Sequence, residues 1–223
     1  MLVKLGAEDV MRMNFKLELI VPLMMLCACG SSVVKADRTI FSPTGETIAP
    51  NGLKTQFAIS GESKNPNRTW LQYGSPGGIE IELERLDLST ERKKGYALNL
   101  QYPITPSLTR AIPAVSFGVR DLFGTSNEHG SFYFAVSKTA GLSDNEYKIL
   151  KEVKFNFGVG TGRIAGLFIG AQFQFKNRMR FSAEVYERKV NVDATIPLIS
   201  GFDAKVYSLN NHIFYGFSYN FSK

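Results

Sequence analysis

Cysteine is almost missing from this chain of 223 residues, and its two cysteines, Cys27 and Cys29, are separated by one residue near the N-terminus. The remaining sequence therefore has no disulfide and no thiol chemistry. Histidine is equally scarce, with only His129 and His212, which are well separated in the sequence. Because a metal site needs about three or four converging ligands, we expect no metal and no cofactor.

Long apolar runs are also missing. The longest extends from Leu19 to Cys29, and its eleven residues are too few to cross a bilayer as a helix. This run follows the basic residues Arg12 and Lys16 and precedes the small residues Gly30 to Ser32, which is the layout of a secretory signal peptide. We therefore predict that residues 1–36 are a signal peptide with an upstream extension, and that the protein is exported.

Two cleavage points remain open. The triplet Val34-Lys35-Ala36 has the small-residue pattern of an ordinary signal peptidase site, which would place cleavage between residues 36 and 37. The run Leu26-Cys27-Ala28-Cys29-Gly30 resembles a bacterial lipobox, with cleavage between residues 28 and 29 and lipid attached to Cys29. Both alternatives leave residues 37–223 as one exported domain.

Enzyme motifs are weak. Ser126, Glu128 and His129 are neighbours on one predicted loop, and residues so close in sequence rarely reach the geometry of a catalytic triad. The glycine run from Gly158 to Gly162 connects a strand to a turn with no helix after it, which does not make a phosphate-binding loop. We therefore predict no catalytic residues and a non-enzymatic protein.

Alternation of apolar and polar residues with a period of two dominates the exported part. The segment around Ile81 is typical, since Ile79, Ile81 and Leu83 alternate with glutamates. Such alternation predicts β-strands with one apolar face. Comparable runs cover 53–60, 96–102, 115–119, 132–136, 153–159, 167–175, 179–185, 190–196, 202–209 and 213–221.

The connections between these runs are mostly short, so neighbouring strands should pair in sequence order. The turn signals are Pro76-Gly77-Gly78, Lys94-Gly95, Thr161-Gly162, Lys176-Asn177-Arg178 and Asn210-Asn211. About ten to twelve strands in one closed, up-and-down antiparallel β-barrel would leave no open sheet edge. Segments Arg38 to Asn51 and Gly61 to Gln72 look irregular, and a plug, a periplasmic lead-in and a loop are all open for them.

The two strand faces favour a transmembrane barrel over a soluble one. Small and polar residues on the polar face suit a crowded lumen: Gly158, Gly170, Gln172, Ser182, Gly216, Ser218 and Asn220. Aromatic residues near the strand ends of the apolar face fit the girdles of outer-membrane barrels: Tyr96, Tyr102, Phe173, Phe175, Tyr215, Tyr219 and Phe221. A closed barrel also pairs every backbone amide, as lipid requires. We therefore predict a bacterial outer-membrane location.

The order of several short segments resembles the YjbH-like outer-membrane proteins, which are linked to exopolysaccharide production. The matching segments are Ser42-Pro43-Thr44-Gly45 with Pro50, Gly78 to Leu83, Ile112 to Asp121 with Gly124-Thr125, Phe157 to Gly160, Gly166 to Ala171, and Ala183 to Tyr186 leading into Val190 to Val192. The chain departs from the family pattern at Glu187-Arg188 and holds one barrel unit. The resemblance implies a barrel that takes part in polysaccharide assembly or export, without supplying a mechanism.

Charged residues on the polar strand face should line the lumen, and they are Glu80, Glu82, Glu84, Arg120, Lys154, Arg180 and Glu184. Opposite charges in a narrow barrel usually pair across strands and lock it shut, although a conduction or sugar-binding path is the alternative. The three glutamates on one strand repel one another unless Arg120, Arg180 or Lys154 compensates them.

These observations predict a non-enzymatic outer-membrane β-barrel, acting in exopolysaccharide assembly or export as a narrow channel or a scaffold. Two alternatives stay open, which are an outer-membrane enzyme and a periplasmic lipid-binding barrel anchored through Cys29. The expected partners are outer-membrane lipid, polysaccharide and proteins of the secretion machinery, with no nucleic acid.

Overall fold

The computed structural model describes residues 39–40, 42–61, 67–87, 94–105, 112–125, 130–141, 149–186, 188–199, 201–209 and 211–221. All of these belong to one compact unit of the chain, residues 32–223. The predicted signal peptide, Cys29 and the loop residues Ser126, Glu128 and His129 lie outside the described residues.

The described residues form twelve strands and one short 3-10 helix, η1 (Gly162–Ile164). The strands are β1 (Leu53–Ser60), β2 (Arg68–Gly74), β3 (Glu80–Asp87), β4 (Lys94–Thr105), β5 (Ala114–Arg120), β6 (Ser131–Gly141), β7 (Leu150–Gly160), β8 (Gly166–Phe175), β9 (Arg180–Tyr186), β10 (Lys189–Ile199), β11 (Phe202–Leu209) and β12 (His212–Phe221).

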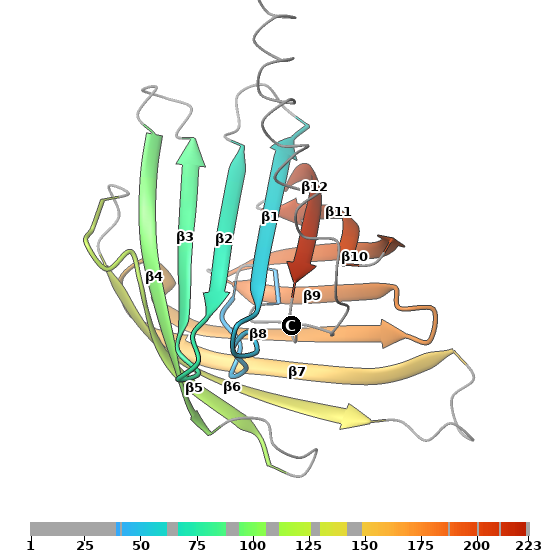
Figure 1. Ribbon diagram of the computed structural model, residues 1–223, viewed down its shortest axis with the longest axis horizontal. Coiled ribbons are helices and arrows are strands. Elements are labelled where there is room, and N and C mark those ends of the chain that lie inside the picture. Colours follow the sequence, from blue (N-terminus) through green and yellow to red (C-terminus); the bar gives the residue numbers. More distant parts are fainter. Residues whose placement is uncertain are drawn as a thin grey trace, which may run out of the picture. The chain divides into compact units, whose positions relative to one another are not determined.

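Each strand pairs antiparallel with the next one in the sequence, and β12 pairs with β1, which closes the barrel (Figure 1). In that seam Leu53 lies opposite Phe221 and Ser60 opposite Phe214. Closure leaves no sheet edge, and it confirms the predicted all-β, up-and-down antiparallel barrel with a strand count at the top of the predicted range. Within the described residues, no helix has the length and apolar character needed to cross a membrane.

The barrel wall has charged residues inside and apolar residues outside. On β3 the glutamates Glu80, Glu82 and Glu84 are at most 4% exposed, whereas Ile81 and Leu83 between them are 38% and 44% exposed. A strand alternates its side chains between two faces, so this pattern assigns the glutamates to the interior and the aliphatic residues to the exterior. This polarity is the reverse of a soluble protein, where charged groups are almost never fully buried unless paired.

The structure corrects four details of the sequence prediction. Residues 68–74 of the supposedly irregular Gly61 to Gln72 segment form β2 and continue the wall. The predicted turn at Lys94-Gly95 is the start of β4, and the Thr161-Gly162 turn continues into η1. His212, expected in a loop, is the first residue of β12. Apart from β2, these differences concern connections and strand ends, where residues typical of turns are also tolerated.

An apolar cluster fills the lumen at the end of the barrel where β1 finishes, which we call the far end. Its members are mostly aromatic: Ala58, Trp70, Tyr133, Ala135, Ile164, Phe168, Tyr186, Tyr207, Leu209 and Phe214. Tyr207 and Phe214 stack with ring centroids 5.6 Å apart. The lumen therefore has an apolar region at its far end, next to buried charged residues such as Arg120 and Glu184.

Candidate functional site

The segment that precedes β1 lies inside the barrel. Its residues 39–40 and 42–52, which we call the plug, form no strand, yet Ser42, Thr44 and Ile48 are no more than 1% exposed. In Figure 1 this blue segment lies within the ring of strands. A barrel of twelve strands encloses more room than wall side chains alone fill. Of the three possibilities open for residues 38–51, the structure therefore shows a plug.

Glu184 of β9 holds the far part of the plug. Its Oε2 accepts hydrogen bonds from the backbone N–H of Ile40 at 3.1 Å, from the backbone N–H of Ser42 at 3.0 Å, and from the Ser42 hydroxyl at 2.7 Å. Its other oxygen accepts a bond of 2.9 Å from the Asn191 amide. One buried carboxylate thus satisfies three donors of the plug, and such charge-assisted bonds are the stronger kind.

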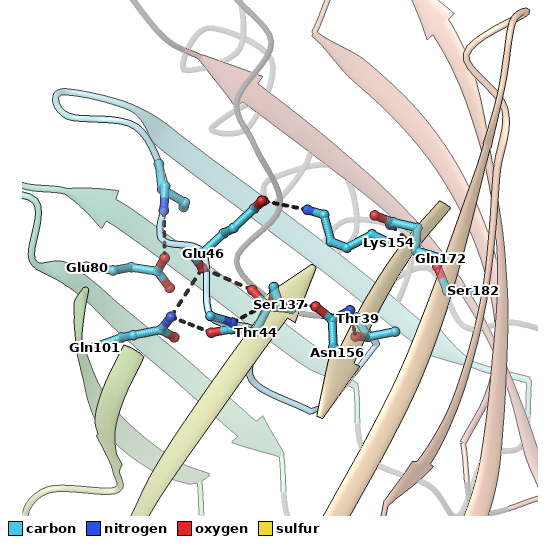
Figure 2. Close-up of polar contacts among 12 residues, drawn as sticks. Thr39, Thr44, Glu46, Glu80, Gln101, Ser137, Lys154, Asn156, Gln172 and Ser182 are labelled. Carbon is cyan, nitrogen blue, oxygen red and sulfur yellow. Dashed lines mark hydrogen bonds and ion pairs between the residues drawn. The ribbon is translucent and has the colours of Figure 1, made fainter. Parts of the chain in front are cut away.

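Side chains of β4 and β5 hold the middle of the plug. The Gln101 amide donates to the carbonyl oxygens of Thr44 and Glu46 at 2.8 and 3.1 Å, and the Ser116 hydroxyl donates to the same Thr44 carbonyl at 2.9 Å. Figure 2 shows Gln101 pointing at this stretch of the plug from the wall. The irregular backbone of the plug therefore obtains from the wall the hydrogen bonds that a strand would obtain from its neighbours.

Two glycines let the plug and the wall approach closely. The Gly45 N–H donates to the Ser137 hydroxyl at 2.7 Å, and a Cβ at Gly45 would collide with the carbonyl oxygen of Ala114. A Cβ at Gly74, the last residue of β2, would likewise collide with the carbonyl oxygen of Ala49. Close backbone approach is a standard reason for glycine, and here it fits the plug to the wall.

The plug also carries a charge into the lumen. Glu46 Oε2 lies 2.5 Å from Nζ of Lys154 on β7, and both side chains are less than 10% exposed. Beside this ion pair the Asn156 amide donates to the Thr39 hydroxyl at 2.8 Å (Figure 2). On the opposite wall Glu80 accepts a bond of 2.9 Å from the Ile48 N–H. The plug is therefore bonded to strands on several sides of the lumen.

Six of the seven predicted lumen charges are buried, whereas the seventh, Arg180, is half-buried. Glu82 accepts hydrogen bonds from the side-chain amides of Gln72 at 2.6 Å and Asn99 at 2.5 Å. Arg120 lies within electrostatic reach of Glu84 and Glu184.

The glutamates of β3 thus have several kinds of partner. Glu80 receives the plug backbone, and Glu84 lies 3.9 Å from Nη1 of Arg68. Of the three cations expected to compensate these glutamates, Lys154 pairs with the plug residue Glu46, and Arg180 pairs with Asp203 at 2.6 Å. Arg120 lies near Glu84 and lines the same small cavity as Glu80 and Glu82.

A second part of the lumen is bonded within itself. The residues of this self-bonded wall, on β1 and β9 to β12, are Gln56, Arg180, Asp193, Thr195, Asp203, Lys205, Ser218 and Asn220. Asp203 accepts from Arg180 at 2.6 Å and from Asn220 at 3.3 Å, and Lys205 donates to Gln56 at 3.2 Å. Thr195 donates to Asp193 at 2.8 Å. These bonds join wall residues to one another and do not involve the plug.

Sequence reasoning did not single out the residues that complete these networks. Glu46 lies in the irregular segment, and Gln101, Ser116, Ser137 and Asn156 are uncharged. Gln101, Ser116, Ser137 and Asn156 each lie on the inner face of a strand. That position is the one feature of the sequence that could have indicated their role in the lumen. Their convergence on the plug depends on contacts between residues 55 to 117 positions apart in the sequence.

A small cavity lies between the plug and the wall. A polar cavity of about 10 Å³, roughly the room of one water molecule, remains beside Pro43. Gln101, Arg120 and Tyr133 are among its lining residues. Among the described residues no group of histidines, cysteines and carboxylates is arranged to hold a metal ion. The site is therefore a hydrogen-bonding lumen filled by its own chain.

A closed antiparallel barrel with an apolar exterior and a polar interior has the architecture of an outer-membrane barrel. Two solved structures share this fold, the KdgM porin in complex with disordered oligogalacturonate (11% identity) and the KdgM porin (10% identity). Each match covers 77% of this chain and 99% of the porin, with a TM-score of 0.50. No protein-family model matches the chain, and no curated protein matches it.

Proposed function

We propose that this protein is a non-enzymatic outer-membrane β-barrel of the channel type. The observation that carries the proposal is the reversed polarity of the wall, seen most plainly on β3, where Glu82 is 4% exposed and Leu83 is 44% exposed. Large apolar side chains also cover the outside of β12, with Tyr215 and Phe217 more than half exposed. Such a surface is costly in water and favourable in hydrocarbon.

We further propose that the barrel acts on polysaccharide, in the assembly or export of an exopolysaccharide. The support is the resemblance to YjbH-like proteins, together with an interior built from carboxylates, amides and hydroxyls. A fold neighbour, the KdgM porin, has been solved with oligogalacturonate. Polar groups of these kinds are suited to the hydroxyls of a sugar, since each hydroxyl both donates and accepts hydrogen bonds.

A second candidate function is a closed scaffold that holds partners of the secretion machinery. The plug and the apolar cluster favour it, because both occupy the lumen with side chains of the protein itself. Conductance across a planar bilayer separates the two. A channel predicts current steps that grow when the plug is loosened by Glu46→Gln, whereas a scaffold predicts no current with either protein.

The membrane proposal is tested by purification from the membrane fraction. We expect heat-modifiable migration on a gel after detergent extraction. We also expect Leu83→Arg to destabilise the barrel by about 2–4 kcal/mol in lipid, because it places a charge against hydrocarbon. Phe123→Arg, in the exposed connection after β5, is the control and should cost little. A freely soluble monomer without detergent would rule the proposal out.

We also propose that the protein is exported, because residues 1–36 have the layout of a secretory signal peptide. Mass analysis of the mature N-terminus distinguishes the two cleavage points. Cleavage between residues 28 and 29 gives a lipid-modified Cys29, and cleavage between residues 36 and 37 gives an unmodified Asp37.

A further inference from the structure

We infer that the plug occupies a binding path for an uncharged saccharide chain, and that plug and saccharide compete for the same wall groups. The path consists of Glu80, Gln101, Ser116, Ser137, Lys154, Asn156 and Glu184. The inference rests on the proposed function for its class of ligand. It adds the place where the ligand binds and the element that it displaces.

The chemistry of the plug contacts is that of a polyhydroxylated chain. Toward Glu184 the plug presents a hydroxyl and two N–H groups, toward Gln101 two carbonyl oxygens, and toward Asn156 the hydroxyl of Thr39. A sugar hydroxyl can replace any of these, because it offers one donor and two acceptor positions. The same hydrogen-bonding wall groups can therefore be satisfied by either occupant, whereas Lys154 exchanges the carboxylate of Glu46 for neutral oxygen atoms.

The plug is not needed to close the wall. The seam between β1 and β12 completes the barrel, and the plug contributes no strand. Among its described residues, Ile40 packs against the apolar cluster, and the side chains of Pro43 and Ile48 are fully buried. A hydrogen bond contributes only about 0.5–1.5 kcal/mol when one partner replaces another, so a ligand that supplies equivalent bonds can displace the plug.

The small cavity beside Pro43 gives a ligand a first position next to the plug. Glu80, Gln101 and Arg120 line it, and the Tyr133 hydroxyl donates to Gln101 at 2.9 Å. The cavity thus combines polar groups with an aromatic ring at the edge of the plug. Bonds made there would compete with those from Gln101 to the plug carbonyls.

The charge of the wall favours an uncharged saccharide over an acidic one. When the plug leaves, Glu46 leaves with it, and the buried carboxylates of Glu80, Glu82, Glu84 and Glu184 remain. Arg68, Arg120 and Lys154 bring three positive charges against these four carboxylates. The path therefore has no excess of positive charge to attract a polymer of uronic acids.

Hydrogen–deuterium exchange on the full chain in detergent micelles tests the competition directly. The probe is a neutral hexasaccharide of glucose, compared with a hexasaccharide of galacturonate and with polyethylene glycol of similar length. We expect the neutral sugar to raise the exchange rate of residues 39–48 by about five-fold or more, in a saturable way, since their N–H bonds to the wall are lost. Exchange of β10 to β12 should not change.

Unchanged or slower exchange of the plug with the neutral sugar would overturn the inference, as would an equal response to polyethylene glycol. A response to galacturonate alone would overturn the assignment of an uncharged ligand. These results are independent of the membrane test, because a barrel that passes the gel test can still fail this one.

The affinity of two variants for the neutral sugar tests whether the plug competes with it. Glu46→Gln weakens the plug and leaves the wall intact, so affinity for the neutral sugar should rise roughly ten-fold. Gln101→Ala removes a group that bonds both the plug and the sugar, so affinity should change less than with Glu46→Gln. Asp203→Asn, the same carboxylate-to-amide change on the self-bonded wall, is the matched control and should leave affinity unchanged. If Glu46→Gln leaves affinity unchanged or lowers it while the variant remains heat-modifiable, the inference is wrong.

Discussion

The two polar walls of the lumen satisfy their buried polar and charged groups in different ways. On the strands that face the plug, buried groups such as Glu184 and Lys154 are satisfied by residues 39–48 of the chain. On the self-bonded wall, Arg180 and Asp203 lie 2.6 Å apart on neighbouring parts of the sheet. Removing the plug therefore leaves charges without partners on the first wall and has no direct effect on the second.

This difference indicates which wall of the lumen can exchange the plug for a ligand. A wall whose polar groups pair with each other has little to gain from a ligand, because its bonds must break first. A wall whose groups pair with a separate segment can exchange that segment for something of like chemistry. Substitutions on each wall can break or sharpen the comparison.

The largest effect is expected from Lys154→Met, which leaves the buried carboxylate of Glu46 without its cation. Removing one partner of a buried pair costs about 3–5 kcal/mol. Arg180→Met should cost about 1 kcal/mol, because that pair is more exposed, with Arg180 at 23%. Urea unfolding followed by heat-modifiable migration measures both.

A double substitution controls for simple loss of packing. Adding Glu46→Gln to Lys154→Met removes the stranded charge and should recover most of the lost stability. If the losses of stability from the two substitutions simply add, the broken ion pair is not the cause of the loss seen with Lys154→Met.

An intermediate effect is expected from Gly45→Ala, whose methyl group meets the carbonyl oxygen of Ala114. Overpacking of this kind costs about 1–3 kcal/mol, and here the plug can yield by moving away from the wall. Exchange at Ile48, which is bonded to Glu80, should then accelerate. Gly77→Ala is the control, because a Cβ there meets nothing nearer than Ser75 Oγ at 3.9 Å.

The smallest effect is expected from Ser42→Ala, which removes one of three plug donors to Glu184 and should cost about 1 kcal/mol. Thr195→Ala removes a comparable bond to Asp193 on the self-bonded wall. Exchange of the plug should increase only with Ser42→Ala. An equal increase with Thr195→Ala would show that the two walls are coupled.

Most of the barrel could be predicted from the sequence, because each strand places apolar residues on one face. The exception is β2, where Trp70 faces inward and Leu71 faces outward. With large apolar residues on both faces, the period of two disappears and the strand looks irregular. The inward tryptophan belongs to the apolar cluster at the far end, which polar-in, apolar-out reasoning does not anticipate.

The site could be predicted only in part. The inner face of each strand follows from the alternation, so the positions of Glu80 and Glu184 could be inferred. Their partners could not, because Ile48 and Ser42 belong to a segment without periodicity and lie 32 and 142 residues away in the sequence. Which wall an irregular segment touches depends on its path through the lumen, and alternation carries no information on that path.

The plug runs directly into β1, and the last plug residue, Gly52, is fixed to the wall by the bond from the Gly74 N–H at 2.9 Å. A displaced plug is therefore tethered at the rim, where a short linker keeps its effective concentration near the millimolar range. Any ligand in the lumen must therefore compete with a plug that remains attached to the barrel. When the occupant leaves, the barrel reseals itself without help from another molecule.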